Sequence, residues 1–237
     1  MQTNLIIWLS TWDFYRVTNT RNTDEMISEY FAIEETNAIE IMFHNISDTE
    51  QQIGKETIGK YFSYCSIHAP VYNYQNDEKS HKILKIINNI CSMLPIKNIV
   101  IHPDLFIDRS VFYQYSNLPF SIENLDDNKK SCKWIQDIWK ILKGNPDFWF
   151  TLDLQHCFTN DPSMQLAKDF HKEFWSKIVE YHISWFHPEY IHYPLFKTKQ
   201  IQIIKALENV NIPIIIESTF DEKTELKKEI EYILSLF

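Results

Sequence analysis

The amino-acid sequence predicts one α/β domain, a (β/α)₈ TIM barrel that spans residues 1–237. Eight short apolar runs, rich in Ile, Val, Phe, Tyr and Trp, alternate along the chain with segments of helical periodicity. The alternation continues without a linker and without a change in composition. Strand–helix alternation of this kind, over a length that one barrel can accommodate, is typical of a single parallel barrel.

The apolar runs are predicted to be the barrel strands. Most of them are near-continuous rather than alternating, which is the pattern of parallel strands covered on both faces. They cover residues 4–9, 38–43, 64–68, 97–102, 119–123, 148–153, 179–184 and 212–217. The first run lies in MQTNLIIWLSTWD, has no basic region before it and is six residues long. It is therefore interpreted as a strand and not as a signal peptide or a membrane span.

Helical periodicity is clearest in three intervening segments, residues 77–94, 131–144 and 220–237. In each, apolar residues recur three and four positions apart, which places them on one helix face. The three stripes are Ile83, Ile86, Ile87, Ile90 and Met93; Trp134, Ile135, Ile138 and Leu142; and Leu226, Ile230, Ile233 and Leu234. Gly144 and Pro146 are expected to end the second helix, and acidic residues open the third.

Composition argues against several functional classes. The net charge of −9 weakens any proposal of non-specific binding to nucleic acid or to an anionic membrane. The chain's glycines, Gly54, Gly59 and Gly144, cannot form a glycine-rich phosphate loop. Its four cysteines show no CxxC spacing, which disfavours a zinc ribbon or a redox pair and suits the reduced thiols of a cytoplasmic protein.

Residues that can bind a metal ion stand at the ends of the predicted strands. Five runs finish on such a residue and a sixth carries one near its end: His68, His102, Glu123, Asp153, Glu217 and His182. The C-terminal ends of the strands in a parallel barrel converge on one rim. A single acidic residue there could be a helix N-cap, and a single histidine could be a core group. Six at matching positions predict a metal centre.

Other titratable residues are assigned lesser roles. His44 is interpreted as structural, and His81, His171 and His187 as surface or helix-face residues. Glu40 lies inside the second predicted strand, where a side chain directed into the barrel would support the centre.

Seven short motifs follow the predicted strand ends in order. They are SIHAP (66–70), VIHPD (100–104), SIENL (121–125), LDLQH (152–156), HIS (182–184), IHYPL (191–195) and IIIES (214–218). With these motifs the chain resembles, over nearly its whole length, the xylose isomerase-like TIM barrel superfamily. That superfamily includes sugar phosphate isomerases and epimerases as well as endonuclease IV, the AP endonuclease family 2.

The resemblance implies a centre of one to three divalent ions, with zinc, manganese or iron expected. Glu123 would be a carboxylate that bridges two ions. His68 and His102 would complete the shell of one ion, and Asp153, His182 and Glu217 that of the other.

A third zinc in the endonuclease IV branch is held by residues that match His156 and His192. That branch adds an aspartate two residues before the second histidine, where this chain has Tyr190 beside Glu189. A phenol is seldom ionised near neutral pH. The third position is therefore predicted to be empty or weakly occupied, and His156 to orient the substrate instead.

Three kinds of activity are compatible with the resemblance. In the sugar-isomerising members, an ion holds two substrate oxygens while two glutamates move a proton between neighbouring carbons; Glu123 and Glu217 match this pair. In the nuclease members, clustered zinc ions activate hydroxide and stabilise the leaving oxygen of a phosphodiester. The third activity is metal-dependent modification of another small molecule or a peptide.

Several residues help to choose among these activities. His68 and His102 favour a multinuclear site, and with it hydrolysis. Against DNA, residues 124–130 read NLDDNKK where the nuclease branch has a TAGQG-like stretch, and Trp185 follows HIS where that branch has asparagine. The chain also has only three arginines, too few for a rim that contacts several phosphates. A small carbohydrate-like substrate is favoured over DNA, and the metal, substrate and oligomeric state stay open.

The rim loops leave two further questions open. Their aromatic residues could wall a sugar pocket or could equally pack the mouth of the barrel. These residues are Tyr72, Tyr74, Phe158, Trp185, Phe186 and Tyr193. Lys197 and Lys199 follow the seventh strand, near the place where barrel enzymes often hold a phosphate.

Overall fold

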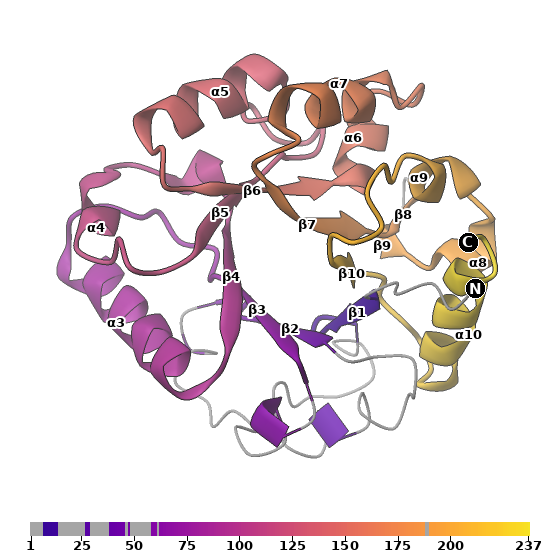
Figure 1. Ribbon diagram of the computed structural model, residues 1–237, viewed down its shortest axis with the longest axis horizontal. Coiled ribbons are helices and arrows are strands. Elements are labelled where there is room, and N and C mark those ends of the chain that lie inside the picture. The colour runs from indigo at the N-terminus through magenta and orange to yellow at the C-terminus, as the bar shows by residue number, and fades with distance from the viewer. Residues whose placement is uncertain are drawn as a thin grey trace.

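The computed structural model describes residues 7–13, 27–28, 38–45, 47, 58–60, 62–187 and 190–237. Eight strands form a closed barrel in the order β1-β10-β7-β6-β5-β4-β3-β2 (Figure 1). The strands are β1 (Ile7–Ser10), β2 (Ala38–Met42), β3 (Tyr64–His68), β4 (Ile96–Ile101), β5 (Phe120–Glu123), β6 (Trp149–Asp153), β7 (Ile178–Ile183) and β10 (Ile214–Ile216). All neighbours pair in parallel, which confirms the predicted (β/α)₈ barrel.

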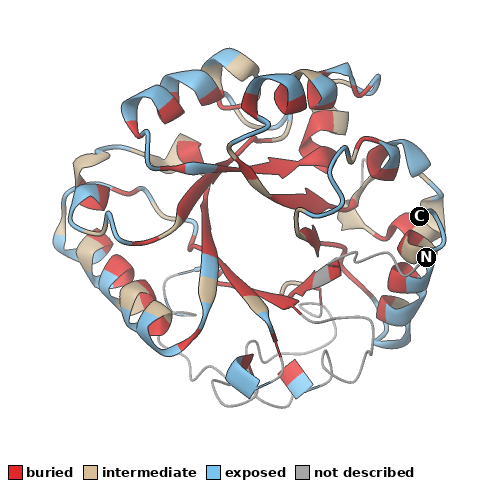
Figure 2. Cartoon of the chain, in the orientation of Figure 1, coloured by how far each residue is buried: buried red, intermediate tan, exposed pale blue. Residues whose placement is uncertain are grey.

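Helices surround the barrel and turn their buried faces towards it (Figure 2). They are α3 (Glu78–Met93), α4 (Ser110–Tyr113), α5 (Ile135–Gly144), α6 (Leu154–Asn160), α7 (Gln165–Phe174), α8 (Leu195–Thr198), α9 (Ile201–Lys205) and α10 (Thr224–Leu234), with a 3₁₀ turn η2 (Pro103–Leu105). The apolar residues of the strands that face outwards, such as Ile39 and Ile67, belong to the same core as the helix stripes.

Two residues of the predicted helix stripes lie in water instead. Met93 is 49% exposed, and the buried position at the end of α3 is taken by the next residue, Leu94. Trp134 is 44% exposed because α5 begins one residue later. The carboxylate of Asp137 accepts the backbone N–H groups of Lys133 and Trp134, which fixes the start of the helix there.

The interior of the barrel is unusually polar below its rim. Glu40, Ser66, Asn98, Ser121, Thr151 and Glu180 are all fully buried. Asn98 donates to Thr151 and to Glu180, and Thr151 is hydrogen-bonded to Ser121, so these side chains meet across the interior. Branched apolar residues usually fill this space in a parallel barrel. A polar layer therefore supports the rim from below.

Two further features were not predicted. Between β7 and α8 the chain forms an antiparallel hairpin of β8 (Trp185–His187) and β9 (Tyr190–Tyr193). His171 lies on α7 as expected of a helix-face residue, but that face is covered: the ring is buried against Tyr181 of β7, at 2.9 Å from its hydroxyl.

Among the described residues, no helix has both the length and the apolar character needed to cross a membrane.

Candidate metal centre

Glu123, the last residue of β5, is surrounded by three histidines from other strand ends. His182 Nδ1 lies 2.9 Å from its Oε1, and His102 Nε2 lies 3.1 Å from its Oε2. His68 Nε2 is 3.6 Å from the same Oε2. Because β3, β4, β5 and β7 run parallel, their C-terminal ends bring these side chains to one rim.

The described residues contain three groups of ligand-type side chains, and the two at the rim share Glu123. One rim group is His68, His102 and Glu123, and the other is Glu123, Asp153, His182 and Glu217. The third group, Glu40, Glu180 and His182, lies in the polar interior. Within each group the potential ligand atoms lie within 4.8 Å of one another. The two rim groups are the sets of residues that the sequence resemblance implies, and the shared residue is the expected bridging carboxylate.

Two buried oxygens at this rim need a partner. Within the described part of the chain, neither Glu123 Oε2 nor Asp153 Oδ2 has a hydrogen-bond donor in good geometry. A buried carboxylate oxygen that lacks a partner costs about 1–3 kcal/mol or more. A divalent cation would satisfy both oxygens, and mixed imidazole and carboxylate ligands suit zinc, manganese or iron. The residues present therefore fit a divalent metal ion.

His182 and the carboxylates around it stabilise each other's charged forms. Burial alone would lower the pKa of His182, but Glu217, Glu40 and Glu123 outweigh it and hold this pKa well above its usual value. In the same way, burial would raise the pKa of Glu217, and His182 instead lowers it to about 2. Burial prevails at Asp153 and raises its pKa to about 8, so a cation would displace a proton from this group.

Asn124 fixes the positions of Asp153 and His156. Its side-chain amide pairs with the backbone of Asp153, with Oδ1 accepting at 2.8 Å and Nδ2 donating at 2.9 Å. Asp153 also caps α6 by accepting the backbone N–H of His156 at 2.7 Å. The carbonyl oxygen of Asn124 lies 2.8 Å from Nδ1 of His156 and binds a proton on that nitrogen. Nε2 of His156 is thereby left as the nitrogen that can accept a ligand.

His156 and His192 come close to each other but lie outside the groups of potential ligands in the described chain. Their ring centroids are 6.2 Å apart, and Nδ1 of His192 is 3.0 Å from the hydroxyl of Ser184. Neither histidine belongs to a set of three potential ligands among the described residues. Glu189 lies outside the described residues, as does the side chain of Tyr190. That the third metal position is empty or weakly occupied stays a prediction.

A cavity of about 480 Å³ opens onto the two rim groups. Its lining includes Glu123, Glu217, His156 and His192 together with a wall of apolar and aromatic residues. That wall contains Trp12, which stacks on His44 with ring centroids 5.2 Å apart. His44, interpreted from the sequence as structural, thus also borders the cavity.

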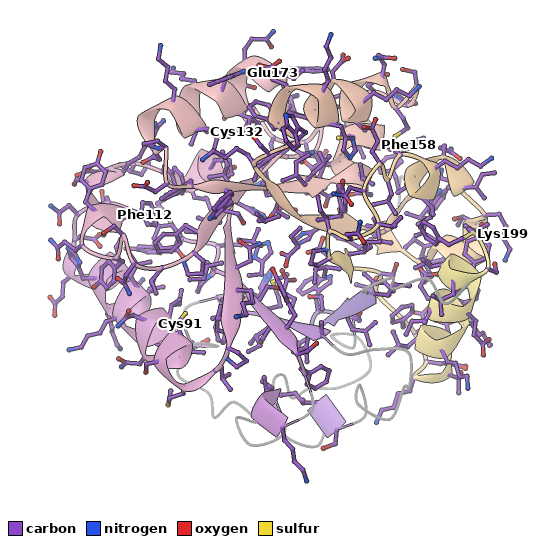
Figure 3. All side chains as sticks on the ribbon, viewed as in Figure 1. Cys91, Phe112, Cys132, Phe158, Glu173 and Lys199 are labelled. Atoms are coloured by element: carbon purple, nitrogen blue, oxygen red, sulfur yellow. The ribbon has the colours of Figure 1, made fainter. Side chains whose placement is uncertain are left out.

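The rim aromatic residues named in the sequence analysis are not among the described residues that line this cavity, and four of them, Tyr72, Tyr74, Phe158 and Trp185, pack in or against the core. Tyr74, for example, is fully buried against Phe112 in the outer layer (Figure 3). Lys197 instead pairs with Glu225 at 2.7 Å, and Lys199 lies over Tyr232 at the outer edge of the molecule (Figure 3). Among the described residues, Lys129 is the lysine that borders the cavity, and its Nζ is 3.1 Å from Asp104.

Sequence reasoning missed two buried carboxylates near the centre. Glu180 lies two residues before His182, and the strand period of two places both on the interior face, so this signal was available. Asp13 follows β1 and is fully buried, with both oxygens unpartnered in the described chain. Burial, followed by Glu217, raises its pKa well above the usual value. Asp13 lies three residues beyond the strand end, which placed it outside the motif search.

Comparisons with known proteins show the same architecture. No protein-family model matches the chain, and no curated protein matches it in sequence. Among solved structures, it is similar to 3-keto-D-glucoside 4-epimerase from E. coli (11% identity, covering 98% of this chain and 99% of that one, TM-score 0.64). It is also similar to D-allulose 3-epimerase from Methylomonas sp. (13%, 98% and 97%, 0.68) and endonuclease IV from Thermus thermophilus (12%, 98% and 98%, 0.68).

At these identities the similarity shows the fold alone. It agrees with the resemblance found in the strand-end motifs, because both branches of the superfamily appear among the matches. The chain therefore has the fold of the xylose isomerase-like TIM barrels, which is shared by sugar epimerases and endonuclease IV.

Proposed function

We propose that this protein is a metal-dependent isomerase or epimerase of a small carbohydrate-like molecule, a sugar or sugar phosphate. The observation that carries the proposal is that Glu123 and Glu217 line one cavity and both approach the same ring nitrogen, Nδ1 of His182, at 2.9 and 3.1 Å. Two ionised carboxylates at one cavity suit the removal and return of a proton at neighbouring carbons or on opposite faces of one carbon.

The residues around the cavity would have separate chemical roles in this reaction. A divalent ion held by the rim residues would polarise the substrate carbonyl and so make the neighbouring C–H more acidic. Glu217 and Glu123, whose pKa values His182 holds low against the effect of burial, would exchange the proton. His156, with its proton bound to the backbone of Asn124, would accept a hydrogen bond from a substrate hydroxyl through Nε2.

The small number of basic residues in the described cavity lining favours a small substrate over DNA. Lys129 is the one lysine among the described residues that line it, and arginine is absent from that lining. A protein that binds the DNA backbone needs several such phosphate contacts. Trp12, stacked on His44, offers the flat apolar surface on which the C–H face of a sugar packs.

If the protein transfers a proton next to a carbonyl, the substrate should exchange that hydrogen with solvent. On incubation with keto-sugars in deuterated water, the protein is expected to place deuterium on a carbon adjacent to the carbonyl of its substrate. Mass spectrometry and proton NMR of a panel of keto-sugars and their phosphates would measure the incorporation. Nicking of abasic-site DNA at the rate of a repair enzyme, with no exchange into any sugar, would contradict the proposal.

The second candidate is an endonuclease IV-like hydrolase, and the group of His68, His102 and Glu123 favours it, because these residues could hold an ion beside the first. Replacement of His156 by alanine tests the choice. If His156 orients a substrate, the variant is expected to show a raised KM or a lowered kcat with metal content unchanged. Elemental analysis of the variant and of wild type measures this content. Loss of one full metal equivalent would establish a third site and favour hydrolysis.

A further inference from the structure

The ring of His182 has carboxylates at both of its nitrogens. Nδ1 faces the rim, at 2.9 Å from Glu123 and 3.1 Å from Glu217. Nε2 faces the polar interior of the barrel, where Glu180 and Glu40 each lie 3.3 Å away. His182, Glu40 and Glu180 are all fully buried. Nδ1 is therefore the ring nitrogen that can bind a metal ion at the rim, and Nε2 can interact only with the carboxylates of the interior.

Glu180 is firmly anchored in that interior. Its Oε1 accepts a hydrogen bond from Asn98 Nδ2 at 3.0 Å and lies 3.3 Å from His182 Nε2 with hydrogen-bond geometry. Its Oε2 accepts from the hydroxyl of Tyr64 at 3.4 Å. Asn98 in turn donates to Thr151 at 3.1 Å. Tyr64 lies on β3 and Asn98 on β4, so two neighbouring strands fix the Glu180 carboxylate, and Thr151 of β6 holds Asn98 in turn.

Glu40 is equally near but is not anchored. Its Oε2 approaches His182 Nε2 at 3.3 Å without hydrogen-bond geometry. Neither of its oxygens has a hydrogen-bond donor among the described residues. One N–H can point well at only one acceptor, and the anchored carboxylate is the one for which the contact has hydrogen-bond geometry. Glu40 and Glu180 thus differ in role, although both are carboxylates at 3.3 Å from His182 Nε2.

We propose that Glu180 is a positioning residue for His182: it accepts the Nε2–H and thereby keeps Nδ1 free and aimed at the metal centre. The inference rests on the metal centre of the proposed function. A histidine that ligates a metal usually donates its other N–H to a carboxylate or carbonyl, which fixes the ring orientation and raises its basicity as a ligand. Here Asn98 and Tyr64 extend the support by one further layer.

A matched pair of substitutions tests the assignment, Glu180→Gln and Glu40→Gln. Both remove one buried carboxylate charge at 3.3 Å from Nε2 and keep the size of the side chain. Glu180→Gln is expected to weaken manganese or zinc binding about 10–100-fold, as loss of such partners usually does. Glu40→Gln is expected to stay below that range. Competition with a chelator of known affinity measures the dissociation constants, and circular dichroism checks that both variants are folded.

The metal-free protein provides a second readout. With ¹⁵N-labelled histidine, wild type and Glu40→Gln are expected to show a slowly exchanging, downfield Nε2–H proton that disappears in Glu180→Gln. A His182→Asn variant assigns the signal. Equal changes in both glutamine variants, or wild-type affinity and an intact signal in Glu180→Gln, would overturn the assignment. If the protein binds no metal but the signal depends on Glu180, the proposed function fails while the Glu180–His182 contact stands.

Discussion

Removal of bound metal is expected to abolish turnover, and readdition of zinc, manganese or iron to restore it. Six potential ligands from six strand ends, Glu123 and Glu217 among them, gather at one rim, and two buried carboxylate oxygens there have no well-aligned hydrogen-bond donor in the described chain. A metal that polarises a carbonyl contributes several kcal/mol to the transition state, which corresponds to about 10³-fold or more in rate. The protein is accordingly expected to purify with metal.

Elemental analysis before and after dialysis against a chelator measures the metal content, and deuterium exchange into the substrate measures turnover. His102→Ala is expected to lower the metal content, because His102 Nε2 lies 3.1 Å from Glu123. His81→Ala serves as the matched control, since His81 lies on α3, is bonded to Asn76 and belongs neither to the groups of potential ligands nor to the cavity lining in the described chain. Less than about 0.2 ion per chain, even after metal is supplied, would rule the centre out.

The fold could be predicted because a parallel barrel leaves a strong pattern in its strands. Barrel strands are buried on both faces, so runs such as residues 148–153 are almost uninterrupted apolar sequence, and the polar residue that ends most of the runs marks the rim. The observed strands overlap all eight predicted runs, and residues 4–6 of the first lie outside the described residues. The ligand-type residues followed from the same pattern, because a strand end fixes where its last side chain goes.

The cavity wall could not be predicted in this way. Aromatic residues in rim loops and in the outer layer read alike in sequence, and only tertiary packing decides which of them border the cavity. Tyr74 and Phe158 pack into the core, whereas Trp12, Met42 and His44 border the cavity from the strand ends of β1 and β2. The polar interior was hidden for a related reason. Periodicity shows that a strand is buried, but it does not show which face meets the helices and which meets the barrel axis.

Glu217→Gln and Glu123→Gln are expected to lower turnover by about 10²–10⁴-fold each while the fold survives. Both carboxylates are almost fully buried at the cavity, and the neighbouring histidines, His182 foremost, outweigh burial and keep each pKa low, so each is an ionised acceptor of a proton. An amide keeps the shape of the side chain, but its nitrogen is a donor where the carboxylate oxygen is an acceptor, and it takes up no proton near neutral pH. Circular dichroism and thermal melting check the fold, and Glu231→Gln on the exposed face of α10 is the control.

The two variants are expected to differ in metal content, and that difference separates the two roles of a carboxylate at this rim. Glu123 belongs to both rim groups of potential ligands, whereas Glu217 belongs to one. Glu123→Gln should therefore reduce metal binding at both positions, and Glu217→Gln at one of them only. Turnover lost in Glu217→Gln even when metal is supplied in excess would identify Glu217 as a proton-transfer residue in addition to a ligand. Retention of more than about a tenth of wild-type turnover in either variant would exclude that carboxylate from the proton transfer, because positioned acid–base groups contribute more than this.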